Sequence, residues 1–375
     1  MMSPLMKHQA LAMRGEGALH PAGIAVMLRP VKNPEEIMQA PRPLSLALAV
    51  FPALLAGAAL AAEPACEGYT PAVIGGPVPP PDSDTVAVRW LANANYEFAY
   101  KGKVYLFDAY FNRKARSHNV GFKAEQVNRA DAVFVSHAHF DHISDVGPVA
   151  RQTKAPIVGS QITVDEAIRL GVPKEQTVVA KDGDQLKFGD ATIDIALARH
   201  STIQDGLQAA LGQVYAVDTR PDTPEEKTLT AYVRSLGSND PAIIDKGTLA
   251  FAITFPGGWK AVMVGSAGPV TEGDRELARR IGPVDLAIVA YQPHAVAERQ
   301  IADTWPLIDL FKPKLFLPAH HDASFGTWLD LGLEPLFLKM REEMPGTKFL
   351  APLYRSPICI ATRGAQKGEV ISFKY

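Results

Sequence analysis

Beyond residue 84, short runs of β-branched and aromatic residues alternate with segments whose apolar residues recur at helical spacing. Two glycine-containing turns, Lys101-Gly102-Lys103 and Pro256-Gly257-Gly258, each predict a hairpin between neighbouring runs. Strands are expected at 85–91, 96–100, 104–107, 132–136, 157–159, 187–188, 192–198, 248–255, 259–264, 285–290, 314–317, 359–362 and 370–374. Helices are expected at 143–153, 163–170, 272–281 and 296–311. Because strands come first and strand–helix alternation follows in two similar passes, the pattern predicts a layered α/β protein.

The first 62 residues carry a different pattern, in which one long apolar run follows a basic residue. Residues 44–62 read LSLALAVFPALLAGAALAA, Arg42 precedes them, and Ala59-Leu60-Ala61 fits an Ala-x-Ala cleavage site. A membrane-spanning helix is the alternative, since about 18 apolar residues can cross a bilayer. Pro52 and the lack of a basic cluster after the run favour a cleaved signal peptide instead. We therefore expect a leader over 1–62, no stable membrane anchor, and a periplasmic or secreted mature protein. The true start is left open among Met1, Met27 and Met38.

Composition divides the remainder of the chain into a tether and a folded domain. Residues 63–83 contain Pro77-Val78-Pro79-Pro80-Pro81 and predict an extended, proline-rich tether. Residues 84–375 predict one domain that is long enough to bury a substantial core. Within this domain, 201–247 is polar and interrupted by prolines, which predicts an insertion or lid.

Charge and cysteine content exclude several classes of partner and scaffold. The 38 basic and 40 acidic residues give a formal charge of −2 without a basic stripe, so no nucleic acid is expected as a partner. Two cysteines exclude a cysteine-rich zinc module and an iron–sulfur cluster. In an oxidising compartment we expect Cys66 and Cys359 to form a disulfide, and two free thiols are the alternative.

One motif carries the candidate chemistry, directly after the strand AVFVS. It reads His137-Ala138-His139-Phe140-Asp141-His142 and supplies three imidazoles and one carboxylate within six residues. These are ligands for a borderline divalent metal ion. Strand residues two apart point the same way, so His137 and His139 can face one ion. Asp141 and His142, where the chain turns into a helix, can hold a second.

The pattern H-x-H-x-D-H after a buried strand resembles the signature of the metallo-β-lactamase superfamily, and the resemblance covers roughly residues 85–330. Residues 90–108 resemble that family's opening hairpin, 192–200 resemble the strand that ends in its third histidine, and 314–320 (KPKLFLPAH) resemble its late strand with Pro-x-His. The resemblance implies an α/β fold of the αββα type, a four-layer sandwich with the metal ions at one edge of the two sheets.

The same resemblance implies a ligand for each metal position. His137, His139 and His200 would bind one ion, and Asp141, His142 and His320 would bind the other. His321 is the alternative to His320 and could instead act as a donor in the pocket. Asp141, His320 and His321 are the candidate catalytic groups. Asp108 is expected to hold a ligand histidine in its tautomer, whereas His118 and His294 are expected at the surface or behind the ligands.

Two positions depart from the family pattern. Ser266 stands where many members have an aspartate that bridges the two ions, so the second ion is expected to bind more weakly. Asn93 stands where relatives often have histidine, which changes the floor of the pocket.

These observations predict an exported zinc hydrolase with up to two Zn²⁺ per chain. Zinc lowers the pKa of bound water to about 7, and the resulting hydroxide would attack an ester, lactone, amide or phosphodiester of a small-molecule substrate. A non-catalytic, metal-stabilised binding protein is one alternative. A redox di-iron protein is another, but it would carry glutamate at the second motif position, where this chain has His139. The sequence leaves the substrate and the oligomeric state open.

Overall fold

The computed structural model describes residues 63–113, 117–201, 220–238, 240, 244, 246–291, 297–322 and 332–374. All of them belong to one compact unit that runs from Leu60 to Tyr375. The expected leader and His294 lie outside the described residues. None of the helices in the described ranges combines the length and the apolar character that a membrane crossing requires.

The first sheet has eight strands in the order β15-β14-β1-β2-β3-β4-β5-β6. Its antiparallel half contains the expected hairpin between β2 and β3, and β3 to β6 run parallel. The strands are β1 (Thr85–Ala92), β2 (Asn95–Tyr100), β3 (Lys103–Phe107), β4 (Ala132–Phe134), β5 (Ile157–Gly159), β6 (Thr177–Val179), β14 (Pro357–Ala361) and β15 (Val370–Phe373).

The second sheet has seven strands in the order β13-β12-β11-β10-β9-β8-β7. Strands β10 to β13 are parallel, and β7 to β10 are antiparallel. The strands are β7 (Gln185–Phe188), β8 (Ala191–Leu197), β9 (Leu249–Phe255), β10 (Trp259–Val264), β11 (Leu286–Ala290), β12 (Leu315–Ala319) and β13 (Lys348–Phe349).

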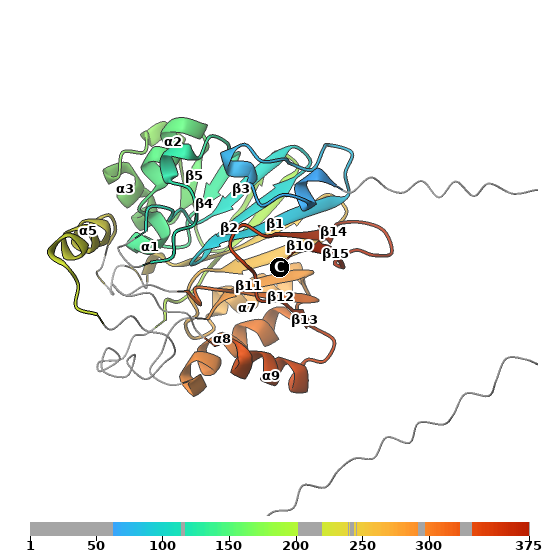
Figure 1. Cartoon of the computed structure of the whole chain (residues 1–375). Coiled ribbons are helices and arrows are strands. Elements are labelled where there is room, and N and C mark those ends of the chain that lie inside the picture. Colours follow the sequence, from blue (N-terminus) through green and yellow to red (C-terminus); the bar gives the residue numbers. More distant parts are fainter. Residues whose placement is uncertain are drawn as a thin grey trace, which may run out of the picture. The chain divides into compact units, whose positions relative to one another are not determined.

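The two sheets pack face to face, and helices cover their outer faces (Figure 1). Alternate residues of the strands form the central core, in which Phe98, Phe107 and Phe134 of the first sheet meet Phe251 and Trp259 of the second. Separate apolar clusters lie beneath the helices on each outer face. The helices are α1 (Phe140–Ile143), α2 (Val146–Thr153), α3 (Gln161–Arg169), α5 (Pro224–Arg234), α7 (Glu272–Ile281), α8 (Ala297–Phe311) and α9 (Glu334–Glu343). The expected αββα sandwich is confirmed.

Residues 63–83 differ from the extended tether predicted for them, because they pack on the first sheet. They contain two short 3₁₀ helices, Pro64–Cys66 and Ala72–Ile74, which bury the side chains of Ala65, Cys66, Ala72 and Val73 in the cluster on the outer face of this sheet. The folded unit therefore includes this segment and begins before residue 84. We call residues 63–76 the N-terminal strap.

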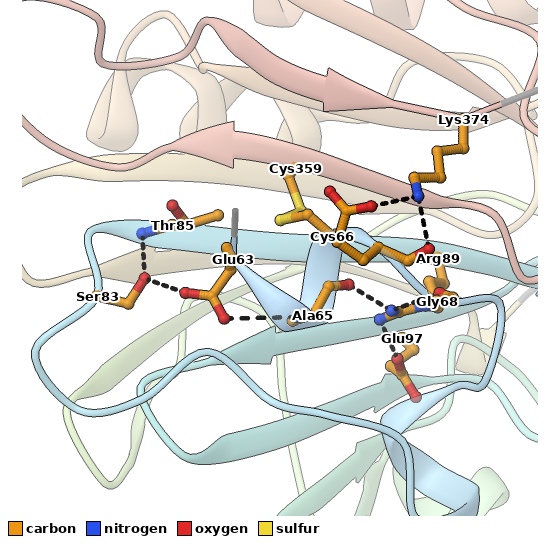
Figure 2. The surroundings of a disulfide bond; sticks show 11 residues. Glu63, Ala65, Cys66, Gly68, Ser83, Thr85, Arg89, Glu97, Cys359 and Lys374 are labelled. Atoms are coloured by element: carbon orange, nitrogen blue, oxygen red, sulfur yellow. Dashed lines mark hydrogen bonds and ion pairs between the residues drawn. A yellow bond between two sulfur atoms is a disulfide. The ribbon is translucent and has the colours of Figure 1, made fainter. Parts of the chain in front are cut away.

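Polar groups and one disulfide hold the strap in place (Figure 2). Arg89 donates hydrogen bonds to the carbonyl oxygens of Ala65 (2.5 Å) and Gly68 (3.3 Å), and it forms an ion pair with Glu97 at 3.1 Å in which both side chains are fully buried. The expected Cys66–Cys359 disulfide is confirmed and ties the strap to β14, with 5.9 Å between the two Cα atoms. Charged residues inside β1 and β2 therefore form hydrogen bonds with a segment that precedes both strands.

The predicted insertion at 201–247 is described only in part. Its described residues include α5, which begins with a capping box between Thr223 and Glu226. After the helix, the backbone N–H of Ser238 donates to the carbonyl oxygen of Ala138 at 2.8 Å, and Val233 within the helix packs with Phe140. This part of the segment thus lies against the histidine motif. Its role as a lid stays a prediction.

Candidate metal centre

The candidate ligands lie where strands of both sheets end. The histidine motif follows β4 and forms α1, whereas His200 follows β8 and His320 follows β12. The side chains form two groups, each with its possible ligand atoms within 4.8 Å of one another: His137, His139 and His200 in one, Asp141, His142 and His320 in the other. These are the two predicted triads, so the structure brings all six residues together. Their binding of metal stays a prediction.

The first triad consists of three imidazoles. The Nε2 atom of His137 and the Nδ1 atom of His139 lie 3.1 Å apart, and the ring centroid of His200 is 4.5 Å from that of His139. The Nδ1 atom of His200 donates to the carbonyl oxygen of Ser201 at 2.7 Å. Because this bond fixes the proton on Nδ1, the Nε2 atom of His200 keeps its lone pair for a metal ion.

The second triad combines a carboxylate with two imidazoles. The Oδ2 atom of Asp141 lies 3.3 Å from Nε2 of His320, and its Oδ1 atom lies 3.9 Å from Nε2 of His142. The ring centroids of His137 and His142 are only 3.9 Å apart, so the two triads adjoin each other. Such proximity suits two ions that act on one substrate.

Asp108 and Ser136 support both triads from behind. Asp108 Oδ2 accepts a hydrogen bond from Nδ1 of His142 (2.8 Å) and another from the Ser136 hydroxyl (3.0 Å). Because the single hydroxyl proton is used there, the Ser136 oxygen is free to accept from Nδ1 of His137, 3.0 Å away. Asp108 thus lies where it was expected, behind a candidate ligand histidine. No role was predicted for Ser136, although it directly precedes the motif in the sequence.

Burial and neighbouring charges set the protonation of these groups. Burial holds the pKa of His137 far below its usual value and lowers the pKa of His139 to about 4 and of His200 to about 3. The first triad is therefore neutral at pH 7, which is the form that binds metal. Burial opposes charge on Asp141 as well, but His142 and His320 outweigh it and hold the pKa of this carboxyl low.

The donor set fits divalent metal ions. Nε2 of His142 and Nδ1 of His320 are buried and have no hydrogen-bond partner. The Nδ1 proton of His142 is committed to Asp108, so Nε2 is the ring nitrogen that faces the second triad and would bind an ion there. An unpaired buried nitrogen is costly unless something binds it. A metal ion in the second triad would satisfy it.

Ser266, which stands where many family members have a bridging aspartate, lies close to the first triad. Ser266 is fully buried, and its hydroxyl accepts a hydrogen bond from the backbone N–H of Ser201 at 3.1 Å. The neighbouring Gly265 leaves no room for a side chain, because a Cβ atom there would lie 2.5 Å from the Ser136 hydroxyl. The loop after β10 therefore packs directly on the groups that support the ligands.

The remaining predicted residues have different surroundings. The ring of His321 is buried and stacks on Trp90, with centroids 4.3 Å apart. Its role as a donor in the pocket stays a prediction. His118 is exposed, and its ring centroid lies 5.4 Å from that of Tyr354. Neither of these two histidines belongs to one of the two triads.

A buried ionic cluster next to the second triad was not predicted. Arg113 forms an ion pair with Asp322 at 2.7 Å, and the Tyr354 hydroxyl donates to the same carboxylate. Burial alone would raise the pKa of Asp322, but Arg113 outweighs it and keeps the pKa low. The sequence offered one signal, which is that Asp322 follows the two histidines after β12.

A cavity of about 810 Å³ lies beside this cluster. Its walls include Arg113, Asp145, α5 residues such as Tyr232, and the exposed His118, but none of the six candidate ligands. The cavity is therefore adjacent to the candidate centre through Arg113 and is not the centre itself.

Comparison with known proteins gives the same family. Residues 103–321 match the family described as the beta-lactamase superfamily domain. A metal-dependent hydrolase of Cupriavidus necator is 27% identical over 283 residues, which cover 74% of this chain and 86% of that protein. The protein named "probable L-ascorbate-6-phosphate lactonase" in Escherichia fergusonii is 25% identical over 231 residues, 58% of this chain and 55% of that protein.

Other relatives are matched over a smaller share of their length, and a solved structure shares the fold. The chain spans 45% of a metal-dependent hydrolase of Pyrobaculum aerophilum, with 28% identity over 104 residues, which are 28% of this chain. A metallo hydrolase from Ignicoccus hospitalis superimposes with a TM-score of 0.52 at 15% identity, over 74% of this chain and 98% of that one. The sandwich, the two triads and the match over most of the folded unit agree, and this chain belongs to the beta-lactamase superfamily.

Proposed function

We propose that this protein is a metal-dependent hydrolase that binds two zinc ions and cleaves an ester, lactone, amide or phosphodiester bond in a small molecule. The single observation that carries the proposal is the pair of adjoining triads, five imidazoles and one carboxylate, on a hydrolase fold. Nitrogen-rich sites with one carboxylate and no thiolate favour zinc over calcium or magnesium. The lactonase relative supports the inclusion of lactones among the substrates to be tested.

The ions would supply Lewis acidity and lower the pKa of water to near neutrality. His137, His139 and His200 would hold the first ion, and Asp141, His142 and His320 the second. The chain's own contribution is to keep these groups rigid and correctly protonated. Asp108 and Ser136 hold protons on the Nδ1 atoms of His142 and His137, so that the Nε2 atoms face inward as acceptors. Proton donation to the leaving group would fall to His320 or His321.

Metal analysis and turnover, measured together, test this proposal. Full-length protein should contain up to two zinc ions and hydrolyse at least one member of a panel with a phosphodiester, a lactone and a cephalosporin. The double variant His137→Ala/His139→Ala should lose both metal and activity, whereas the control His118→Ala should retain both, because His118 is exposed and outside the triads. Retained hydrolysis by the double variant in metal-depleted buffer would refute the assignment. Metal binding without any turnover would favour the non-catalytic alternative.

We also propose that the protein is exported to the periplasm or secreted. The apolar run at 44–62 with its Ala-x-Ala site supports a signal peptide. The Cys66–Cys359 disulfide supports an oxidising compartment, because such bridges are rare in the cytosol. Mass spectrometry of protein from a periplasmic fraction, alkylated without reduction, tests both points. The expected product begins after Ala61 or Ala62 and carries no alkylated cysteine, and a full-length cytosolic product with two alkylated cysteines would refute the proposal.

A further inference from the structure

Asn93 lies at the centre of the hydrogen bonds around the second triad. It is fully buried in the turn between β1 and β2 and has a left-handed backbone, with φ of 49°. Asparagine accepts this conformation more readily than most residues. His320 itself has φ of 62°, so a candidate ligand and its neighbour both adopt backbone conformations that the surroundings must hold in place.

Asn93 contacts two of the three residues of this triad directly. Its side-chain Nδ2 donates to the backbone oxygen of Asp141 at 2.8 Å and lies 3.4 Å from the carboxylate Oδ2 of the same residue. Its backbone oxygen accepts a hydrogen bond from the N–H of His320 at 2.8 Å. One residue thus connects candidate ligands that are 179 positions apart in the sequence, in segments that follow strands of different sheets.

Asn93 is in turn held by the buried ionic cluster. Its backbone N–H donates to Oδ1 of Asp322 at 2.9 Å, while Oδ2 of Asp322 pairs with Arg113 at 2.7 Å. Trp90 Nε1 donates to the same Asn93 oxygen that His320 uses, also at 2.8 Å. The side chains of Arg113 and Asp322 are 3% and 2% exposed, so solvent screens this pair little. The ion pair gives Asn93 a fixed anchor.

We propose that Asn93 is a positioning residue for the second metal ion: its amide orients Asp141 while its backbone, anchored on Asp322, orients His320. This inference rests on the proposed function, since it assumes that the second triad binds an ion. Groups that orient metal ligands change affinity by about 10- to 100-fold when they are removed. In the part of the chain that the structure describes, the hydrogen bonds of Asn93 reach the second triad and not the first, so the affinity of the first triad should not change.

Two substitutions of Asn93 distinguish the contribution of its side-chain amide from that of its backbone conformation. Asn93→Gly removes the side chain but permits the left-handed conformation and keeps all three backbone hydrogen bonds. Asn93→Ala removes the same amide and adds backbone strain. Asn128→Gly is the matched control, because Asn128 is exposed and lies on the loop before β4, away from the triads in its contacts.

The measurement is a zinc titration of the full-length chain, with bound zinc determined by mass spectrometry and affinities by calorimetry. We expect both Asn93 variants to bind the second Zn²⁺ about 10- to 100-fold more weakly than wild type, with the first unchanged and Asn128→Gly identical to wild type. Equal affinity for the second ion in wild type and Asn93→Gly would overturn this inference alone. A wild-type chain that binds fewer than two ions would overturn the two-ion proposal and this inference with it. Failure of both Asn93 variants to fold would also overturn it, since Asn93 would then be required for the fold as a whole.

Discussion

Removal of the Cys66–Cys359 disulfide should destabilise the protein strongly, because the bridge closes most of the folded chain into one loop. The two cysteines are 293 residues apart. The chain-entropy relation gives such a loop an upper limit of about 6 kcal/mol at 25 °C. The measured loss should be smaller, about 3–5 kcal/mol, because residual structure in the unfolded chain reduces the entropy that the bridge removes.

The strap has other contacts that should keep it in place once the bridge is gone. Arg89 holds two of its carbonyl oxygens, and the backbone N–H of Val73 donates to Glu97 at 2.8 Å. The Lys374 ammonium also binds Glu67 at 2.6 Å. We therefore expect the double variant Cys66→Ala/Cys359→Ala to fold, with a loss that comes mainly from the unfolded state.

Thermal and urea unfolding check this prediction. For a folded unit of roughly 310 residues, a loss of about 4 kcal/mol lowers Tm by about 6 °C. Dithiothreitol should lower the Tm of wild type toward that of the variant and leave the variant unchanged, which controls for the substitutions themselves. A Tm of the variant within 1 °C of wild type would refute the reasoning, as would a reductant effect on the variant of the same size as on wild type.

Three further changes test other features. Ser266→Asp should tighten binding of the second zinc ion in a chelator titration, because it restores a carboxylate beside the triads, and identical loss of both ions in wild type and variant would count against this. Glu97→Gln should lower the free energy of unfolding by about 3–5 kcal/mol in urea, because it leaves Arg89 buried without its counter-charge. Glu369→Gln, at an exposed pair, is the control and should show no measurable change. Burial raises the pKa of Asp145 to about 6, so the folded state holds this proton more tightly than the unfolded one. The stability of wild type relative to Asp145→Asn should therefore fall by roughly 2 kcal/mol as the pH rises from about 4 to 6, and parallel stability curves would contradict this.

The sequence by itself determined most of the elements and most of the candidate ligands. Strand and helix positions followed from apolar periodicity, and the strands at 85–91 and 259–264 and the helix at 272–281 recur within one residue at each end. The motif from His137 to His142 was readable because its residues are contiguous and follow one strand. His200 and His320 could be assigned only through the family resemblance, since nothing in their local sequence connects them to the motif.

Tertiary structure alone decided what surrounds these elements. Arg89 and Glu97 lie in strands whose sequence predicts burial. No local pattern shows that they pair with each other and form hydrogen bonds with the N-terminal strap. The proline-rich composition of 63–83 predicted an extended tether, but burial of Val73 and the disulfide at Cys66 outweigh that local tendency. The helix α9 was missed, because its apolar residues show only weak periodicity and its packing partners come from the second sheet.

The same distinction holds at the candidate centre. Residue types and spacing identify ligands, because metal chemistry limits which side chains can serve. The groups that orient the ligands are set by distance in space: Asn93 meets Asp141, His320 and Asp322, and Asp322 meets Arg113, across separations of 48 to 229 residues. Hydrogen bonds and ion pairs of this kind depend on where two sheets place their loop ends, and that placement arises only when the whole core has packed.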